Sequence, residues 1–323
     1  MLIAAIDLGF GRVKGALGDR RAEFPAVAAL APTLDLGEVA ARRVLVDPDG
    51  GKWLVGTDAA GEAVRAAFSA DKAEQPAERA KALRLFADLL GDRWVAVINR
   101  VITGLPIHEL AAQKDAVRRL LSGTHHFSFD GRRYSIVVGD VRVIPQGAGC
   151  YYATALRDGR AVTDAPTGRV AVLDLGYRTC NMIALDAGRY LADRSGTLDL
   201  GVSRVHLEAQ RRILQAHGYA PDLGDMDTIC RTRTLPLGGR TVDVSGIVSG
   251  ASQDVAERIA EEAQVLLGDP RRYSATILAG GGAQLVRPWI EARFPAVIVP
   301  AQPQMANAIG YAEYGRLLAR QSA

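Results

Sequence analysis

A short motif occurs twice in this chain, and the repeat limits the folds that are open to it. Residues 5–10 read Ala-Ile-Asp-Leu-Gly-Phe, and residues 172–177 read Val-Leu-Asp-Leu-Gly-Tyr. In both places an apolar strand ends in Asp, a glycine and an aromatic residue follow, and a second strand-like run begins. A single Asp-x-Gly is most often an ordinary turn. Two copies in matching contexts, one in each half, indicate one structural unit used twice.

The segments around the motifs alternate between short Val- and Ile-rich runs and longer amphipathic stretches, which is typical of α/β architecture. We expect strands at 2–6, 13–17, 94–103, 169–173, 181–185 and 275–278, with 94–103 buried. A hairpin is expected over 127–138, with its turn at Asp130-Gly131. Helices are expected at 78–90, 108–121, 203–217, 252–267, 283–291 and 304–320.

Composition excludes several classes of protein. With 323 residues, 48% of them hydrophobic and 23% charged, the chain is globular and long enough for about two domains. A net charge of only +3 argues against a protein that coats nucleic acid. Three scattered cysteines suggest neither a disulfide framework nor a zinc site. The apolar stretches are too short for a membrane span or a signal peptide, so we expect a cytoplasmic protein.

The repeated unit has the chemistry of a phosphate site. Glycine lets the backbone approach a ligand closely, and concave sets of backbone amides bind phosphate oxygens. Asp7 and Asp174 would repel phosphate, but each can hold Mg²⁺ or its water ligands. Lys14 follows the first motif and adds a cation for β- and γ-phosphates, although a lysine there is usually only a solvated strand residue.

Three other segments carry glycine or small residues. Gly280-Gly281-Gly282 lies between a strand and a helix, where a flat ring or a phosphate can approach the backbone; neither a Rossmann fingerprint nor a Walker A motif is present. Residues 143–151 read Val-Ile-Pro-Gln-Gly-Ala-Gly-Cys-Tyr. They form either a plain hinge or a segment in which Gln146 orients an attacking water. Small residues recur at 303–310, where we expect a packed helix crossing at Ala308.

Taken in order, these segments resemble the actin, sugar-kinase and heat-shock-chaperone superfamily. Residues 7–14 are similar to its first phosphate motif, 144–152 to its first connecting helix and 174–179 to its second phosphate motif. Residues 278–285 are similar to its adenosine motif, and 303–311 to its second connecting helix. The Asp-Leu-Gly-Phe-Gly opening and the Pro-Gln-Gly-Ala-Gly segment most resemble prokaryotic actin-like proteins of the ParM/StbA type.

The resemblance implies an actin-like (ribonuclease H-like) α/β fold with two domains and a nucleotide cleft between the halves. Domain I would span 1–157, with a C-terminal helix at 304–323 returning to it, and domain II would span 158–303. Gln146, Asp174 and Asp7 would be catalytic, and both aspartates would hold Mg²⁺ through water. The nucleotide would contact Gly9, Phe10, Gly11, Lys14, Gly176, Tyr177, Arg178, Thr179, Gly280, Gly281 and Gly282.

One departure from the superfamily pattern concerns Arg178, which stands where a second glycine is usual. Either the backbone approaches the phosphates less closely there, or the guanidinium itself meets a phosphate.

The family resemblance implies an ATP (or GTP) hydrolase that assembles head to tail into nucleotide-dependent filaments. Its role would be plasmid or DNA segregation, or another cytoskeletal task, with a DNA-binding adaptor protein as a possible partner and with no direct contact to nucleic acid or membrane. Two alternatives share the fold: a non-polymerising ATPase adaptor or chaperone, and a small-molecule kinase. The segment around Gln146 lacks the Asp base that a kinase needs. Nothing after Ala323 would form a chaperone's substrate-binding domain, but the adaptor remains open.

Overall fold

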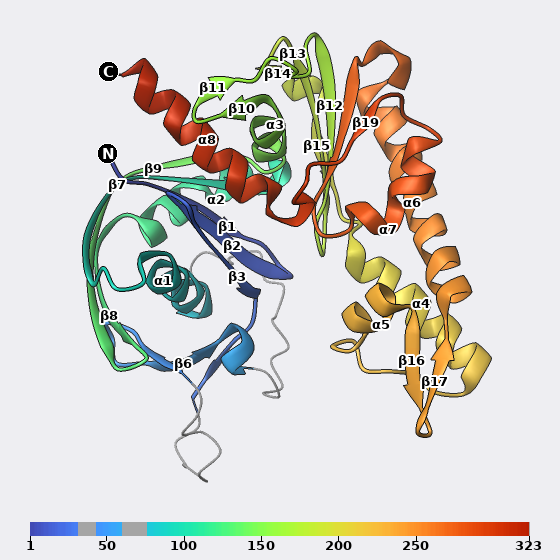
Figure 1. Ribbon diagram of the computed structural model, residues 1–323, viewed down its shortest axis with the longest axis horizontal. Helices are drawn as coiled ribbons and strands as arrows, with labels where there is room; N and C mark the ends of the chain where they lie inside the picture. The colour runs from blue at the N-terminus through green and yellow to red at the C-terminus, as the bar shows by residue number, and fades with distance from the viewer. Residues whose placement is uncertain (32–42, 60–75, 323) are drawn as a thin grey trace. The chain divides into compact units, whose positions relative to one another are not determined.

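The computed structural model describes residues 1–31, 43–59 and 76–322. Its contacts divide the chain into two compact units. Unit 1 comprises Met1–Ala165 and Met305–Ala323, and unit 2 comprises Pro166–Gln304. Each unit combines a sheet with covering helices, so each is an α/β structure by itself (Figure 1).

Unit 1 is built on a nine-stranded mixed sheet with the order β3-β2-β1-β7-β9-β8-β5-β6-β4. The strands are β1 (Ile3–Leu8), β2 (Arg12–Leu17), β3 (Arg20–Pro25), β4 (Ala28–Leu30), β5 (Val44–Val46), β6 (Lys52–Val55), β7 (Val95–Leu105), β8 (Gly123–Phe129) and β9 (Arg132–Pro145). β7 pairs in parallel with both β1 and β9, which places the carboxyl ends of these three strands at one edge of the sheet. β1 and β2 form an antiparallel hairpin, as do β8 and β9.

The helices of unit 1 are α1 (Pro76–Leu90), α2 (Ile107–Leu121), α3 (Ala148–Ala155) and α8 (Ala306–Gln321). Leu85 and Phe86 of α1 belong to a core cluster with Val101 of β7, and Val117 of α2 joins the same cluster. Tyr311 of α8 packs in a second cluster with Ile102. Because neighbouring residues of a strand point to opposite faces, α1 and α2 cover one face of the sheet and α8 covers the other. Two short strands, β10 (Leu156–Arg157) and β11 (Arg160–Ala161), follow α3.

Unit 2 has a smaller sheet with the order β14-β13-β12-β18-β19, and β15 also pairs with β13. Its strands are β12 (Arg169–Leu175), β13 (Cys180–Asp186), β14 (Arg189–Tyr190), β15 (Gly196–Leu198), β18 (Ala275–Ala279) and β19 (Val297–Ile298), and β16 (Thr234–Leu237) and β17 (Arg240–Asp243) form a separate hairpin. The helices are α4 (Val202–His217), α5 (Met226–Thr232), α6 (Ser245–Leu267) and α7 (Ala283–Glu291).

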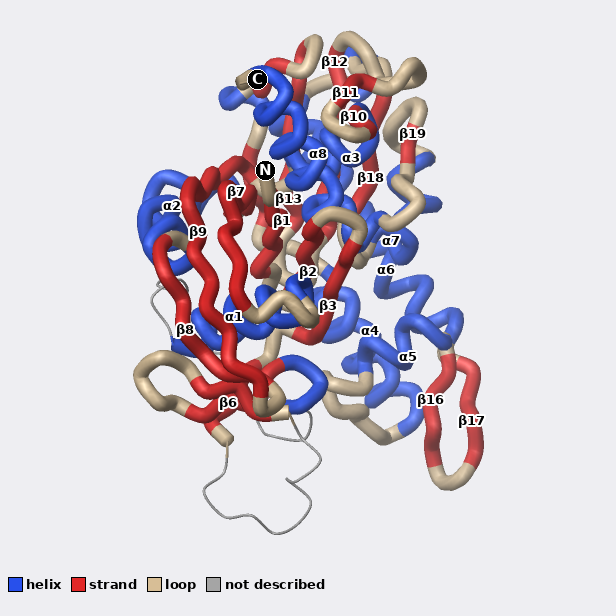
Figure 2. Tube along the Cα trace, turned by 60° about the vertical axis from the view of Figure 1, so that its left-hand side comes forward, coloured by secondary structure: helices blue, strands red, loops and turns tan. Residues whose placement is uncertain are grey.

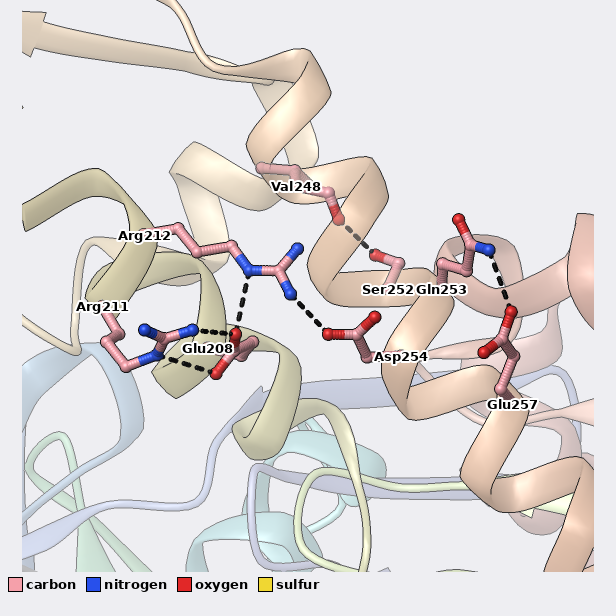
Figure 3. A network of polar contacts seen from close by, with 8 residues as sticks. All are labelled: Glu208, Arg211, Arg212, Val248, Ser252, Gln253, Asp254 and Glu257. Atoms are coloured by element: carbon pink, nitrogen blue, oxygen red, sulfur yellow. Dashed lines mark hydrogen bonds and ion pairs between the residues drawn. The ribbon is translucent and has the colours of Figure 1, made fainter. Parts of the chain in front are cut away.

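A network of charged side chains joins α4 to α6 on the surface of unit 2 (Figure 3). Arg212 of α4 donates from Nε to Glu208 Oε1 at 2.9 Å and from Nη2 to Asp254 of α6. Arg211 also donates to Glu208, and this hydrogen bond is the main cause that lowers the pKa of Glu208 to about 2. The network links the surfaces of the two helices, and α4 begins at Val202, 25 residues after the second repeated motif.

The expected helices and strands are present, with boundaries that differ by a few residues. The largest differences are in α6, which begins at Ser245 rather than at 252, and in β9, which runs to Pro145 rather than to 138. The expectation of a buried strand over 94–103 is wrong for its first half, because Val95 and Val97 are 80% and 61% exposed. In the described ranges, Val95–Ile98 pair with β9 only, because the pairing of β1 with β7 begins at Ile3 and Arg100, so this half of the strand extends past β1 into solvent. Within the described ranges, no helix combines the length and apolarity that a membrane crossing needs.

Candidate functional site

Asp7 lies at the end of the first repeated motif and is completely buried. It is the fifth residue of β1 and pairs across the hairpin with Lys14 of β2. Lys14 Nζ donates to Asp7 Oδ2 at 2.8 Å, and the lysine side chain is only 12% exposed. Burying a carboxylate is costly unless a cation neutralises its charge and both of its oxygens accept hydrogen bonds. Lys14 supplies the cation and the hydrogen bond to Oδ2.

Gln146, from a distant part of the chain, supplies the hydrogen bond to the other oxygen of Asp7. It directly follows β9, and its backbone N–H donates to Leu105 O at the end of β7 at 2.7 Å. Its side-chain Nε2 donates to Asp7 Oδ1 at 3.0 Å. Both carboxylate oxygens of Asp7 therefore have a partner, and the carboxamide of Gln146 is held in a defined orientation.

A small pocket adjoins these residues within unit 1. Its lining includes Leu8, Gly9, Phe10 and Gln146 together with residues 103–106 and the first turns of α2. The volume of the cavity is about 30 Å³, which is enough for one or two water molecules. The pocket lies at the carboxyl ends of parallel strands, where open α/β sheets bind their ligands.

In unit 2 the second repeated motif forms a tight turn between β12 and β13. Gly176 N–H donates to Thr179 O at 2.9 Å and closes the turn, while Asp174 lies one residue inside β12 and is 3% exposed. The first backbone amides of α4 donate hydrogen bonds to carbonyl groups of this turn. Val202 N–H donates to Gly176 O, and Ser203 N–H donates to Tyr177 O. The turn is thereby fixed by the start of a 16-residue helix.

Arg178 lies in this turn, and its side chain is 32% exposed. Its Nε is 3.9 Å from Asp199 Oδ1, and that carboxylate is itself 67% exposed. A guanidinium in this position is accessible to an anion. This exposure is compatible with the interpretation in which the Arg178 side chain meets a phosphate.

The triple glycine packs directly against the second motif. Gly280 has a φ of +87°, and a Cβ there would lie 2.2 Å from Leu175 O. Gly282 N–H donates to the same Leu175 oxygen at 3.1 Å. Gly281 differs, because its Cβ would meet nothing closer than Gln304 Oε1 at 3.5 Å. Gly280 is thus required by the backbone, and a Cβ on Gly282 would lie 2.5 Å from the Leu175 side chain and 2.6 Å from that of Val202, whereas Gly281 has room for a side chain.

The two small-residue segments also meet, within unit 1. Asn307 Oδ1 accepts from Gly147 N–H at 3.0 Å, and α3 crosses α8 so closely that a Cβ on Gly310 would lie 1.7 Å from Gly149 O. Ala308, where the crossing was expected, is fully buried, and the approach that leaves no room for a side chain is at Gly310.

The site contains functional candidates that the sequence did not reveal. Glu109 and Gln113 of α2 line the pocket beside Gln146, and Gln304 adjoins Gly281. Their position in the sequence could have indicated Glu109 and Gln113. Both lie in the first turns of α2, which directly follows a parallel strand, and α/β sheets bind ligands at that end of their strands.

A magnesium ion is the cofactor that such a site implies, and its donor set can be tested against the geometry. The described residues contain no group of three acidic, histidine or cysteine side chains able to chelate a metal. Both oxygens of Asp7 already accept hydrogen bonds. Asp7 would therefore hold a metal ion through that ion's water ligands rather than directly.

Comparison with protein families accounts for most of the chain. The family described as "Actin like proteins N terminal domain" matches residues 5–149. The family described as "Archaeal actin homologue MreB-like, C-terminal" matches residues 172–292. Among curated proteins, none matches the sequence significantly.

Solved structures with the same fold span the whole chain. The archaeal actin homologue Ta0583 has a TM-score of 0.81 at 22% identity and covers 99% of this chain and 100% of its own. A ParM from a 15-stranded filament of Clostridium botulinum has a TM-score of 0.72 at 19% identity, with 98% and 99% covered. The actin-like protein Alp7A has a TM-score of 0.78 at 16% identity, with 99% and 97% covered.

These findings agree with the motifs. Both repeated motifs fall within the matched segments, one in each family's range, and both units have the α/β architecture of actin homologues. The chain is a prokaryotic actin-like protein, with an actin-like-protein N-terminal domain over residues 5–149 and an archaeal MreB-like C-terminal domain over residues 172–292.

Proposed function

We propose that this protein is an ATP (or GTP) hydrolase whose head-to-tail self-assembly is controlled by nucleotide. The observation that carries the proposal is the arrangement around Asp7, where Lys14 and Gln146 converge on one buried carboxylate at the carboxyl ends of parallel strands. A cation and an oriented carboxamide at such a place suit the binding and hydrolysis of a phosphate ester.

Each motif has a distinct part in the proposed reaction. The amides and glycines at 9–11 and 176–179, with Lys14 and Arg178, bind the phosphates, and Gly281 leaves space for the nucleoside. Mg²⁺, held through water by Asp7 and Asp174, would neutralise charge on the phosphates. Gln146 orients a water for attack on the terminal phosphorus. The bond between the terminal phosphorus and the oxygen of the leaving nucleoside diphosphate breaks, and inorganic phosphate is released.

The relatives support the two halves of this proposal separately. A structure of Ta0583 contains ADP. Filament structures exist for the Clostridium botulinum ParM and for Alp12. By analogy, we propose a cytoplasmic, cytoskeletal role such as plasmid or DNA segregation, with attachment to cargo through a separate DNA-binding adaptor.

The role of Gln146 can be tested by its replacement with alanine. Gln146→Ala should slow phosphate release at least about tenfold, because a positioned catalytic group contributes that much or more. The affinity for a fluorescent ATP analogue should change little, since the residue acts after nucleotide binding. Gln253→Ala, which removes an exposed glutamine of α6 that donates to Glu257 and lies outside the proposed site, is the control and should leave phosphate release unchanged. A variant that loses nucleotide affinity and keeps normal turnover of what it binds would show that Gln146 is only structural.

A further inference from the structure

In the described residues, one stretch of β9 in unit 1 has a neighbouring strand on one side only. β9 pairs with β7 as far as Pro145. Its other neighbour, β8, pairs with it only as far as Val138, opposite Gly123 (Figure 2). In the part of the chain that the structure describes, no strand lies along the outer edge of residues 139–145. At about 3.3 Å per residue, the open edge from 139 to 144 is about 20 Å long.

The hydrogen bond of Gln146, which directly follows β9, shows which backbone groups of residues 141–144 face β7 and which face the open edge. Gln146 N–H donates to Leu105 O, on the β7 side. Because peptide groups alternate along a strand, the N–H and C=O groups of Arg142 and Ile144 also face β7. Those of Val141 and Val143 face the other way, toward the open edge. A row of such groups is a template for one more strand.

The open edge forms the floor of a groove of about 540 Å³. Residues 139–144 line it together with Arg118 and Ser122 at the end of α2 and with Tyr314 of α8. Val141 faces the core beneath α2. Arg142 is in register with Ile102, which packs against α8. Alternate side chains of an added strand would therefore meet the end of α2 on one face, and Arg142 and Tyr314 on the other.

The charges in the groove favour one kind of occupant. The side chains of Arg118 and Arg142 are 47% and 48% exposed; Arg118 also donates to Asp115 at 3.1 Å, and that carboxylate is itself 63% exposed to solvent. Asp140, the acidic residue in the lining, is shared between Arg100 at 2.8 Å and Arg142 at 3.8 Å, so its charge is compensated. Arginines on both faces of the groove complement carboxylates that project alternately from an extended chain.

We propose that this edge binds an extended, acidic segment of a partner protein, which adds to the sheet beside β9 by main-chain hydrogen bonds. Such strand addition derives its affinity from the backbone and its specificity from alternate side chains. The surface lies within unit 1 and involves no residue of the proposed nucleotide site, so the proposal does not depend on the proposed function.

The direct test is fluorescence anisotropy with a labelled eight-residue peptide of alternating valine and glutamate. Wild-type protein should bind it in the micromolar range and should bind the alternating valine–lysine peptide at least tenfold more weakly. The same valine–glutamate peptide, N-methylated at alternate residues, cannot donate to the edge and should not bind.

Two variants separate the backbone contribution from the charge. Val143→Pro removes an outward N–H and no bond to β7, and proline is tolerated at such edges. This variant should weaken binding about tenfold with a nearly unchanged melting temperature. Arg142→Glu should reverse the preference between the two peptides. Arg133→Glu, on the part of the same strand that β8 covers, is the matched control and should leave binding unchanged.

The proposal is overturned if wild-type protein binds neither peptide, or binds the glutamate and lysine peptides equally. It is also overturned if Val143→Pro folds normally and binds like wild type. If Val143→Pro does not fold, the reversal by Arg142→Glu decides the question alone. A nucleotide-independent dimer of the wild type that Arg142→Glu disrupts would identify a second copy of this chain as the occupant instead.

Discussion

Asp174 is the buried carboxylate of the second motif, and its loss should affect chemistry more than folding. Asp174→Ala should reduce phosphate release by at least about tenfold, because the proposed metal site loses one of its two anionic groups. Asp186→Ala is a matched control, since Asp186 ends the paired strand β13, its side chain is 44% exposed, and it forms an ion pair with Arg169 at 3.2 Å. If Asp174→Ala and Asp186→Ala both turn over nucleotide at the wild-type rate, the second motif takes no part in catalysis.

His206 is a buried side chain that the proposed chemistry does not use. It is 2% exposed, and in the described residues neither ring nitrogen has a hydrogen-bond partner. Burial lowers the pKa of His206 below its usual 6.5, because the charged imidazolium would be desolvated. Burial lowers the pKa of His125 in unit 1 in the same way. The folded protein therefore binds fewer protons than the unfolded chain near this pH.

The free energy of unfolding should accordingly be highest above pH 6.5 and should fall as the pH drops from 6.5 through the lower folded pKa values. His206→Leu removes one of the two groups and leaves no polar atom unpaired, so its stability should fall less steeply between pH 6.5 and 5. Urea titrations at several pH values measure this. A variant whose stability has the same pH slope as wild type would show that His206 is already paired or hydrated.

Asp7, Lys14 and Gln146 could be proposed from the sequence because each stands in a motif, whereas Glu109 and Gln113 could not be, and the contact between Asp7 and Gln146 could not be predicted either. Asp7 and Gln146 are 139 residues apart, and their hydrogen bond depends on the register of β1, β7 and β9. No local pattern encodes that register. The Asp7–Lys14 pair, in contrast, is a cross-strand pair of one hairpin, and the sequence places both residues near the same ligand.

At the scale of elements, the loop after β18 separates backbone requirements from ligand requirements. Gly280→Ala should lower the melting temperature strongly, because it forces a side chain into a positive-φ position 2.2 Å from Leu175 O. Gly281→Val should keep near-normal apo stability and weaken nucleotide binding, because its side chain enters open space where the nucleoside is proposed to lie. Thermal melts with and without nucleotide distinguish the two. Equal ligand-induced shifts in wild type and Gly281→Val would remove the loop from the site.

The crossing of α3 and α8 depends on two glycines rather than on small residues in general. Gly310→Ala places a Cβ 1.7 Å from Gly149 O, and it should destabilise unit 1 by about 3 kcal/mol, the upper part of the usual cost of overpacking. The matched control is Gly246→Ala in α6, where a Cβ meets nothing within 4 Å. The control should be neutral or stabilise by up to about 1 kcal/mol. Chemical unfolding curves for the two variants test the difference, and equal stabilities would contradict it.

Long amphipathic elements could be predicted from the sequence, whereas short or mixed ones could not. The start of α6 was missed because Ser245, Gly246, Ser249 and Gly250 are weak helix formers, and buried Val248 and Ala251 hold that turn in place instead. The strands β4, β5 and β6 are only three or four residues long and carry no clear alternation. Tertiary packing, not local preference, specifies such elements.

At the scale of the molecule, the repeat was the decisive sequence signal. It predicted two α/β units with one motif each, and the two family matches agree with that. The domain limits 1–157 and 158–303 and the cleft between the halves remain predictions, as do the assembly and its switch. A near-neutral chain has little self-repulsion, so identical subunits can associate head to tail, and a contact that does not close on itself gives an open filament.

Nucleotide can control this assembly only as far as it binds the assembling state more tightly than the other. The central claim is therefore tested by sedimentation of the purified protein at micromolar concentration with Mg²⁺ and ATP, GTP, a slowly hydrolysed analogue, ADP or no nucleotide, with electron microscopy of the pellets. We predict filaments with the triphosphate and its analogue, dissolution after hydrolysis, and longer-lived filaments for Gln146→Ala. Sedimentation that is independent of nucleotide would contradict the account and favour a non-polymerising adaptor or kinase.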